Sequence, residues 1–523
     1  MMAEAFEPWG ACPPAWLPDA LAAPQGITTL RWASAGYATG PGDDLPNTVW
    51  APRLLGDVIV TQTALDALGI GGRVALGIAE IALANGDGGL ADLIRYGTAD
   101  GRAVRVLAVP VTNDRASDLG GGARALVFAG MVRSMLPEGD DRASLSLTDI
   151  AERLGVPLQP LKYLGAGHTE GGDELKGSPK PITLGRCYNL PPVSLGNLDL
   201  GAGIGSLPTY QTHWRAIAGH DAVRIRGVEQ VAVAGAPGVG QYRDFPALGM
   251  FQLGSTPDGA VTADLRGDAV GGYANTTASV LRRLLQSLGP AILDEEIDRT
   301  AFDFAEPDLP GEVGFYQGNS EATAAEAVQT MVAGCGAVLA GGRGGRIRLF
   351  DPLAQDADQF TLPEPWVLDC RPVALPAKLR PLPRAVAVSW RPNWQPLSDI
   401  AGVVTGAERE RLGKLATGPA RSESALVTSR VAQQRDMTLP GLYWSEADAL
   451  ARAAKWRAWL EAGPRAFEVT TDRYLGQIEC GHIGRITYPA FGLQTGARGV
   501  VLAWQEALAA RRLTLTLVTL PES

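Results

Sequence analysis

The alternation of apolar and polar positions predicts a hairpin with one wet face in the first third of the chain. In the segment ASLSLT, Leu145 and Leu147 alternate with Ser144 and Ser146, the period-two pattern of a half-buried strand. The residues at 137–140, Pro-Glu-Gly-Asp, supply a turn just before it. Together with the short apolar pieces TTLRWASAGYAT, VRVLAVPV and RALVFAGMVRSML, this hairpin indicates an antiparallel sandwich or barrel.

A similar hairpin is predicted at the C-terminal end, in GVVLAWQEALAARRLTLTLV, where leucines alternate with threonines. The interval from Gly130 to Leu145 is 15 residues and that from Gly499 to Leu515 is 16. One hypothesis is that the two ends carry related β-domains. The alternative, that any two hairpins look alike, stays open.

The apolar period changes to about 3.6 residues in the middle of the chain and predicts a helix over 275–288, ended by Gly289 and Pro290. Its cap is one of three polar residues, Asn275, Thr276 and Thr277. Ser320 can cap a second helix, whose expected inward residues are Ala324, Ala325, Val328, Met331 and Val332. The glycines of 341–345 then turn a hairpin that ends in RIRLF. Helices followed by strands indicate a small α+β domain.

An extended connector is predicted where prolines cluster, at positions 363, 365, 372, 376, 381 and 383, before the strand AVAVSW. A last helix begins at Ser445, with Asp448 three residues later as in a capping box, and it ends before Gly463 and Pro464. Its expected inward residues are Leu450, Ala453, Trp456 and Leu460. We expect this helix to pack on the final β-domain.

These elements predict a mainly β fold class with an α+β domain. At about 150 residues per domain, a chain of 523 residues holds roughly three or four units. The expected order is an N-terminal arm at 1–26, a β-domain at 27–157, an irregular β-rich insertion at 158–266, a small α+β domain at 267–365, and a last part at 366–523 with the proline-rich connector, a helix and a second β-domain.

Composition narrows the class of protein. Hydrophobic residues make up 46% and charged residues 20% of the chain, which is ordinary for a folded globular protein. The formal net charge of −10 argues against a protein that grips nucleic acid by neutralising phosphates. Residues 1–24 lack the pattern of a secretory signal, and no apolar run approaches the ~20 residues that span a bilayer. We therefore expect neither export by a signal nor a membrane span.

The cysteines do not form a recognisable metal or disulfide motif. The five of them, Cys12, Cys187, Cys335, Cys370 and Cys480, lie far apart and include no CxxC pair. They are interpreted as buried free thiols of a protein made in a reducing cytoplasm. An iron–sulfur cluster built from distant segments stays an open alternative that the spacing does not favour.

One acidic segment has residue types that bind cations. In HTEGGDE, His168, Glu170, Asp173 and Glu174 offer nitrogen and oxygen atoms to a metal ion. The spacing is not that of an EF-hand loop, and glycines surround the residues, so a solvated loop is the preferred interpretation. We therefore expect no metal and no cofactor.

The search for catalytic motifs gives one weak pair. Cys480 and His482 alternate along an expected strand, so their side chains would share a face, but no third group orients them. The glycine-rich runs at 201–206 and 235–240 lack a following GK[ST] and an apolar helix, so they are turns rather than phosphate loops. No catalytic residue is assigned, although paired carboxylates of a glycosidase would leave no spacing signature.

Several phrases together resemble the tail hub, or tail-tip, proteins of long-tailed bacteriophages and gene transfer agents. The most telling phrase is KGSPKPITLGRCYNLPP at 176–192, with Gly177, Pro179, Pro181, Gly185, Arg186 and Asn189. TGPGDDLPNTVWAPRL, GIAEIALANGDGGLADLIRYGTADGRAVRV, SWRPNW at 389–394 and LGQIECGHIGRITYPAFGLQTGARGVVL add to it, in the same order as in that family. The resemblance covers most of 28–517.

This resemblance implies a non-enzymatic structural hub of a phage tail tip or baseplate. It implies two tail-tube-like β-domains per chain, so that a homotrimeric ring continues a sixfold tube and lines the DNA exit channel. Implied partners are the distal tail protein or tail tube, the tip or fibre proteins and the tape measure protein. The implied location is the virion, after assembly in the bacterial cytoplasm. A receptor- or carbohydrate-binding tail protein and, less favoured, a peptidoglycan hydrolase stay as alternatives.

Overall fold

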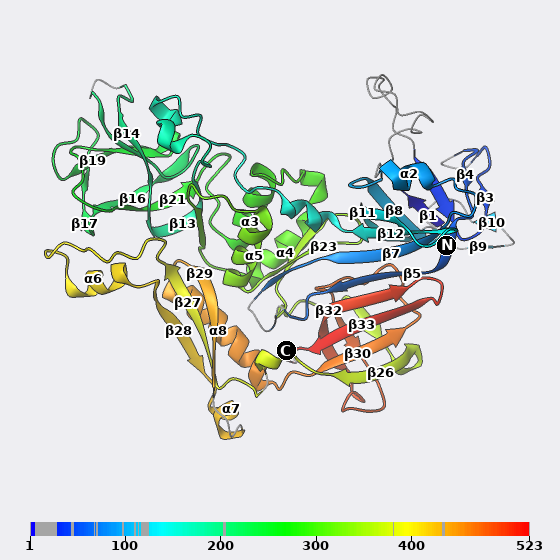
Figure 1. Cartoon of the computed structure of the whole chain (residues 1–523). Coiled ribbons are helices and arrows are strands. Elements are labelled where there is room, and N and C mark those ends of the chain that lie inside the picture. The colour runs from blue at the N-terminus through cyan, green and yellow to red at the C-terminus, as the bar shows by residue number, and fades with distance from the viewer. Residues whose placement is uncertain are drawn as a thin grey trace, which may run out of the picture.

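The structure is a computed structural model that describes residues 2–5, 29–42, 46–66, 68, 72–96, 99–108, 111–112, 115–116, 125–201, 205–379, 381–430 and 435–521. Figure 1 shows a large sheet on the right, helices in the centre, and two further β-regions on the left, one above the other. Most of the arm expected at 1–26 lies outside the described residues. Met2–Ala5 forms β1, which lies within the large sheet.

The large sheet contains both ends of the chain and has 13 strands in the described part of the molecule. Across the sheet the strands are β2 (Leu30–Ala33), β1, β8 (Ala103–Ala108), β11 (Ala125–Pro137), β12 (Arg142–Thr148), β7 (Gly77–Ala84), β5 (Leu54–Thr63), β32 (Ala497–Ala507), β33 (Arg512–Thr519), β30 (Ala466–Thr471) and β26 (Val367–Val373). Off this path, β31 (Ile483–Ile486) pairs with β32 and with β25 (Phe360–Leu362). The strands of the N-terminal part and those of the C-terminal part meet where β5 pairs antiparallel with β32.

The two predicted hairpins are both present and bury their leucines in one core. Leu145 and Leu147 of β12 and Leu513, Leu515 and Leu517 of β33 belong to a single apolar cluster under the large sheet. The intervening serines of β12 and the threonines at 514 and 516 of β33 remain partly exposed on the other face. The alternation of apolar and polar residues therefore corresponds to a sheet with one buried and one exposed face, as a period of two predicts.

An outer β-domain, residues 182–268 with β22 (Gly314–Gln317), lies at the upper left of Figure 1. Its two sheets, as far as the chain is described, are β17-β16-β21-β13-β22 and β14-β15-β20-β19-β18. The bounds are β13 Ile182–Leu190, β14 Val193–Leu198, β15 Leu207–Gln211, β16 Ile217–Ile225, β17 Val228–Glu229, β18 Val231–Ala232, β19 Gln241–Phe245, β20 Met250–Leu253 and β21 Val261–Asp268. The insertion expected at 158–266 is thus strand-rich, and β21 runs across its expected end.

Helices and a small sheet form the centre of the molecule. They are α3 (Thr277–Ser287), α4 (Arg299–Asp308) and α5 (Ala324–Cys335), with the sheet β24 (Ile347–Phe350), β23 (Val338–Gly341) and β6 (Arg73–Ala75). Their apolar faces share one core, which continues under the three-stranded sheet β28-β27-β29. That sheet, at the lower left of Figure 1, consists of β27 (Ala385–Pro392), β28 (Ala416–Glu423) and β29 (Asp436–Tyr443).

The lower left also contains two short helices, α6 (Gly406–Gly413) and α7 (Ala425–Arg430), and the longer helix α8 (Glu446–Glu461). A short α2 (Ala91–Tyr96) lies over the large sheet. No helix among the described residues is long and apolar enough to span a membrane. The mainly β fold class with α+β parts, predicted from the sequence, is confirmed.

The predicted helices are confirmed in place, with corrections in detail. Thr276 caps α3 in a capping box, within the predicted set of caps. The second helix is capped by Thr323, not Ser320, because the Thr323 hydroxyl accepts from the Glu326 amide and the Glu326 carboxylate accepts from Thr323 in return. Ser445 caps α8 as predicted.

The expected packing of α8 was wrong in two respects. The helix packs mainly on β27 and β28 rather than on the final β-domain. Leu450, expected to face inward, is 44% exposed, whereas the buried face includes Ala449, Arg452 and Trp456. The cause is a buried ion pair: Arg452 reaches Asp351 with both terminal nitrogens, at 2.7 and 2.9 Å, and this rotates a charged residue toward the core.

Candidate functional site

The polar side chains of the acidic segment at 168–174 make hydrogen bonds and an ion pair with neighbouring segments of the chain. Glu170 accepts hydrogen bonds from Lys180 Nζ at 2.6 Å and from the Leu164 amide, and the ammonium holds the pKa of this carboxyl below its ordinary value. His168 Nε2 lies 3.2 Å from the Asp199 carbonyl oxygen. Asp173 and Glu174 begin a short 3₁₀ turn. Among the described residues, no three His, Cys, Asp or Glu side chains are grouped so that they could hold a metal ion.

The expectation for Cys480 and His482 was wrong, since they lie in the turn before β31 rather than on a strand. The Cys480 thiol is buried, and burial raises its pKa far above the ordinary value. Burial and then Arg348 lower the pKa of His482 to about 4. The imidazole nitrogens lie near the Glu479 amide and the Arg348 guanidinium, and a protonated thiol with a neutral imidazole so placed is no activated nucleophile.

The other described cysteines are Cys187, Cys335 and Cys370, and each is free and buried. They belong to three different apolar cores, so they do not approach one another as ligands of one cluster. Cys12 lies outside the described residues. Of the two glycine-rich runs, 235–240 lies in the loop before β19 and does not begin a helix, and 201–206 lies partly outside the described residues.

The large sheet contains two four-stranded units with the same topology. The first unit is β11-β12-β7-β5 and the second is β32-β33-β30-β26. If the strands of each unit are numbered along the chain, both sheets have the order three, four, two, one, with antiparallel neighbours throughout. This shared order agrees with the hypothesis that the two ends carry related β-domains.

Matching details place the two units in register. A β-bulge interrupts β11 between Val132 and Ser134, and another interrupts β32 between Val501 and Ala503. Directly after the bulges, Ser134 faces Ser146 and Ala503 faces Thr516. One strand further on, Ser146 faces Glu80, and Thr516 faces Glu468, so the same acidic residue occupies the same place in both units. Bulges tend to persist in related folds, which makes them good markers of register.

The two units are joined by the antiparallel strand pair of β5 and β32, which we call the seam. β5 and β32 run antiparallel, with Ile59 opposite Ala507 and Thr63 opposite Ala503. The ladder is extended by bonds from the Ala64 amide to the Leu502 carbonyl, 2.6 Å, and from the Leu508 amide to the Val58 carbonyl, 3.1 Å. The two units therefore form one continuous sheet and cannot swing separately without breaking backbone hydrogen bonds.

A buried arginine in the turn of the central hairpin contacts the seam on the buried face of the sheet. Arg343, in the turn between β23 and β24, is 3% exposed, and its Nη1 lies 2.7 Å from Glu506 Oε2 of β32. The same guanidinium donates to the carbonyls of Ile478 and Val127 and lies 3.7 Å from the centre of the Trp504 ring. Since Val127 belongs to β11, one side chain contacts both units.

Further polar groups join the hairpin to the seam. Gln62 of β5 donates to the Gly341 carbonyl oxygen at 2.7 Å and accepts from Trp504 Nε1 at 3.2 Å. Asp149 accepts from the amides of Gly77 and Ala151, and burial raises its pKa to about 6. A Cβ at Gly341 would lie 2.3 Å from the Asp149 carboxyl carbon, so only glycine fits there.

The other face of the two units is exposed over most of its length and carries small, mostly neutral side chains, whereas Ala466 and Val518 at one end of it are buried in the central core. It includes Ile59, Thr61, Thr63, Ile78, Glu80, Ser134, Ser144, Ser146, Glu468, Thr470, Ala503, Gln505, Thr514 and Thr516, all partly or fully exposed. Hydroxyl groups are the commonest polar groups on it, and its charged side chains are of both signs: Glu80, Asp369 and Glu468 with Arg142, Arg371 and Arg512. The face continues across the seam without interruption because the register does.

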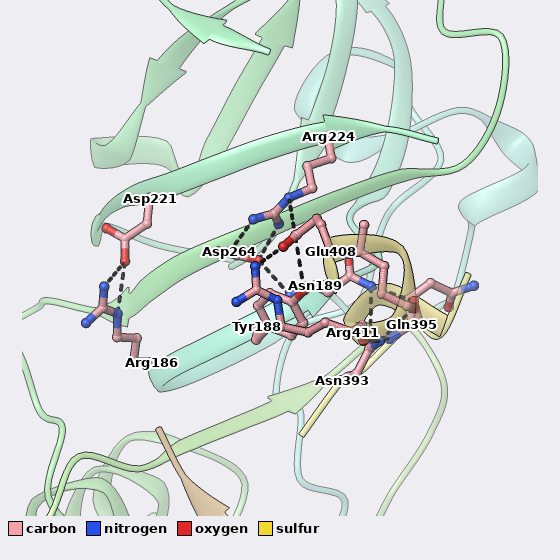
Figure 2. A network of polar contacts seen from close by, with 11 residues as sticks. Arg186, Tyr188, Asn189, Asp221, Arg224, Asp264, Asn393, Gln395, Glu408 and Arg411 are labelled. Atoms are coloured by element: carbon pink, nitrogen blue, oxygen red, sulfur yellow. Dashed lines mark hydrogen bonds and ion pairs between the residues drawn. The ribbon is translucent and has the colours of Figure 1, made fainter. Parts of the chain in front are cut away.

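The two phrases that carried the family resemblance meet far from this sheet. Asn189 of β13, at the end of GRCYN, donates from Nδ2 to Asn393 Oδ1 at 2.8 Å and to the Gln395 carbonyl at 2.7 Å (Figure 2). Asn393, from SWRPNW, donates in turn to the Leu412 and Lys414 carbonyls at the end of α6. Helix-terminal carbonyls need such partners.

A buried ion pair completes this network. Arg224 of β16 binds Asp264 of β21 with two hydrogen bonds of 2.6 and 2.7 Å, and Asp264 also accepts from the Asn189 amide at 2.8 Å (Figure 2). Asn189 has a φ of 50°, a left-handed conformation that asparagine tolerates better than most residues. The phrase thus holds the outer β-domain against the β27 region.

No family model matches the sequence, and no curated protein matches it. The chain is similar to bacteriophage tail proteins among the solved structures. The 43 kDa tail protein of prophage MuSo2 from Shewanella oneidensis is 10% identical, with 91% of this chain and 96% of that chain covered and a TM-score of 0.39.

Two other solved structures belong to the same class of particle or to a related machine. A tail protein from Neisseria meningitidis is 9% identical, with 88% and 91% of the two chains covered and a TM-score of 0.37. A component of the E. coli type VI secretion system, described as similar to tail proteins of bacteriophage T4, is 8% identical, with 90% and 74% covered and a TM-score of 0.34. The functional argument below rests on the chain's own geometry.

Sequence reasoning missed the polar groups of the seam. Arg343 and Gln62 are single residues in unremarkable surroundings, and Glu506 lies on a strand otherwise read by its apolar positions. The available signal was the run GGRGGR, where an arginine sits among glycines that a surface turn does not need in such number.

Proposed function

We propose that the chain is a hub subunit of a phage-like tail tip or baseplate that joins a tail tube to tip or fibre proteins. The observation that carries this proposal is the pair of topologically equal four-stranded units joined into one sheet. A tube with sixfold symmetry repeats one sheet unit six times around its axis. A chain that contributes two units supplies two repeats, so three copies supply six.

The uncovered face of the two units suits the wall of a DNA channel. Serine and threonine are its commonest side chains, and its carboxylates are balanced by arginines, with Arg371 paired to Glu468, so the face has no excess of cations to hold phosphates. A wall that gripped the backbone would need lysines and arginines in number. We therefore assign this face to the lumen, along which DNA and the tape measure protein pass.

The remaining regions then face away from the lumen, where the partners of a hub bind. The outer β-domain and the three-stranded sheet lie on the far side of the central helices from the large sheet (Figure 1). They offer surfaces for the distal tail protein or tube above and for tip or fibre proteins below. In this assignment the protein performs no catalysis and acts in the virion.

Oligomeric mass and symmetry test the proposal. Light scattering should give three times the chain mass of 54.9 kDa, and negative-stain images should show a ring with a central hole. The purified chain should neither clear peptidoglycan nor bind host cells. Clearing by the protein would instead identify a hydrolase, and tight binding to host cells by a monomer would identify a receptor-binding protein.

A further inference from the structure

The seam uses only part of β32, and the equivalent part of β11 has a free edge. β32 pairs with β31 through residues 497–500 and with β5 through residues 503–507. β11 pairs with β8 through residues 125–131, as β32 pairs with β31. At 134–137, however, no strand among the described residues pairs with that edge of β11. Leu136 in this stretch is 59% exposed.

The strand equivalent to β5 also has a free edge. β26 occupies in the second unit the place that β5 occupies in the first, and among the described strands it pairs with β30 alone. Its exposed residues include Leu368 and Arg371. The described strands therefore include one such pair, the seam between β5 and β32. They also include the equivalents of both partners, β26 and β11, each with an unpaired edge. A pairing of these two edges is called the joint below.

These two edges are at opposite ends of the joined units, so they cannot meet within one chain. A second copy can bring its β11 to the β26 of the first. Such a contact uses different surfaces on the two partners, and repeating it gives a closed ring or an open filament. In the proposed hub, repetition of this contact closes a ring. Around that ring, seams within a chain alternate with joints between chains.

The register of the seam predicts the register of the joint, because each position of one four-stranded unit has an equivalent position in the other. Glu80 and Glu468 mark the same place, and their neighbours on the next strand are Ile59 and Arg371. On the other side, the pairs Ser134–Ser146 and Ala503–Thr516 mark the same place. The seam pair Thr61–Gln505 then corresponds to Val373 of one copy opposite Leu136 of the next.

The residues brought together in this way are complementary. Val373 and the exposed Leu136 form an apolar pair. The seam pair Ile59–Ala507 corresponds to Arg371 opposite the exposed Glu138; Arg371 pairs with Glu468 of its own chain, and Glu138 of the next copy would add a second carboxylate beside the exposed guanidinium. Charge and apolar matching at a contact that was located from backbone topology alone is an independent argument for it.

One row of the joint differs from the seam. In the seam, the bonds at the rows Ala64–Leu502 and Val58–Leu508 place the row Val60–Glu506 among the hydrogen-bonded rows, since these alternate. The corresponding row of the joint holds Pro372 and Pro137, and neither has an amide hydrogen to donate. The joint thus lacks two backbone hydrogen bonds that the seam has.

We propose that copies of this chain associate through β26 of one and residues 134–138 of the next, in the register of the seam, with Val373 opposite Leu136. The proposal rests on the proposed ring and names its interface. Because two prolines face each other there, this joint is weaker than the seam, and the ring opens between copies while the two units of each chain stay joined.

Disulfide trapping tests the interface. Val373→Cys with Leu136→Cys, in a Cys12→Ser background, should give covalent dimers and larger species under mild oxidation, because opposite residues in a non-hydrogen-bonded row lie close enough to be bridged. The other four cysteines are buried. The matched control is Thr61→Cys with Gln505→Cys, the equivalent pair in the seam, which should form a bond within one chain without increasing its mass.

Mixing the single variants distinguishes this joint from other contacts. Each single variant should remain unlinked, and the mixture should give covalent dimers only. Cross-linking of a single variant with itself would show a symmetric edge contact and overturn the proposal. Failure of the double variant to cross-link, with the control pair formed, would also overturn it. The mass of the wild-type protein then shows whether the ring itself fails or only this interface.

Discussion

The seam and the network of Figure 2 hold the molecule together in different ways. At the seam, two units share a sheet, and the buried Arg343 adds an ion pair to a ladder of backbone bonds. At the network, the outer β-domain meets the β27 region through one isolated bridge, Tyr188 with Asn393, one further backbone bond from the Ala401 amide to the Arg226 carbonyl, and side chains. Backbone ladders distribute strength over many bonds, whereas a side-chain network concentrates it in a few residues.

The difference between a backbone ladder and a side-chain network indicates which part of the molecule can move. The two units should behave as one rigid body, because opening them breaks several hydrogen bonds together. The outer β-domain should loosen where it meets the β27 region after a single polar substitution, while Ile182, Leu184 and Phe315 still anchor it in the central core. A hub needs this division, since its wall must keep its shape while its outer surfaces adapt to partners.

The largest effect is expected for Arg343→Met. It leaves the Glu506 carboxylate buried without its cation, and breaking such a pair costs about 3–5 kcal/mol of unfolding free energy. Chemical denaturation measures it. The double variant with Glu506→Gln removes the uncompensated charge and should recover a good part of the loss. A loss below about 1 kcal/mol for the single variant would show that the seam does not depend on this residue.

A smaller and more local effect is expected for Asn189→Gly. Glycine keeps the left-handed backbone but removes the hydrogen bonds to Asn393 and Gln395, which should cost about 2 kcal/mol. Hydrogen exchange should rise in the outer β-domain and remain unchanged in β5 and β32. Asn197→Gly, at an exposed position of β14, is the matched control and should leave exchange at the interface unaltered. Faster exchange at the seam would contradict the division.

Acidification should act on the two regions in opposite directions. Burial raises the pKa of Asp149 beside the seam, from 3.8 to about 6, so its contribution to stability is lost as pH rises through 6 and is regained on acidification. Burial lowers the pKa of His213 in the outer β-domain, from 6.5 to about 3, so its contribution is present above 6.5 and is lost as pH falls.

Between pH 7 and pH 5, these shifts correspond to a gain of about 1 kcal/mol at Asp149 and a loss of about 2 kcal/mol at His213. Hydrogen exchange corrected for its intrinsic pH dependence should show the outer β-domain opening first at pH 5. The variants Asp149→Asn and His213→Gln should each remove the pH dependence of their own region only. Equal opening of both regions would show that they are coupled.

The smallest effect concerns association. Replacing Pro137 and Pro372 by valine restores the two amide donors that the row Val60–Glu506 supplies in the seam. The double variant should associate about tenfold more tightly, because two hydrogen bonds of about 0.7 kcal/mol each add about 1.4 kcal/mol to the association free energy. Concentration-dependent light scattering measures the change. Unaltered or weaker association would mean that these edges do not face each other.

The sequence by itself determined the local elements. Period-two leucines predicted β12 and β33, and caps next to apolar periodicity predicted α3 and α8, since strands and helices depend on residues that are close along the chain. The phrases GRCYN and SWRPNW were also visible in the sequence, but only as a resemblance. Nothing in either phrase says that Asn189 and Asn393 bind each other.

Tertiary structure alone decided how the elements combine. The seam pairs β5 with β32 from opposite ends of the chain, and Arg343 reaches Glu506 across it. Strand pairing between distant segments is set by which sheet edges remain free and by which core both can share, and these are properties of the whole fold. A buried ion pair has no periodicity to reveal it, because its two residues meet only after both cores have formed.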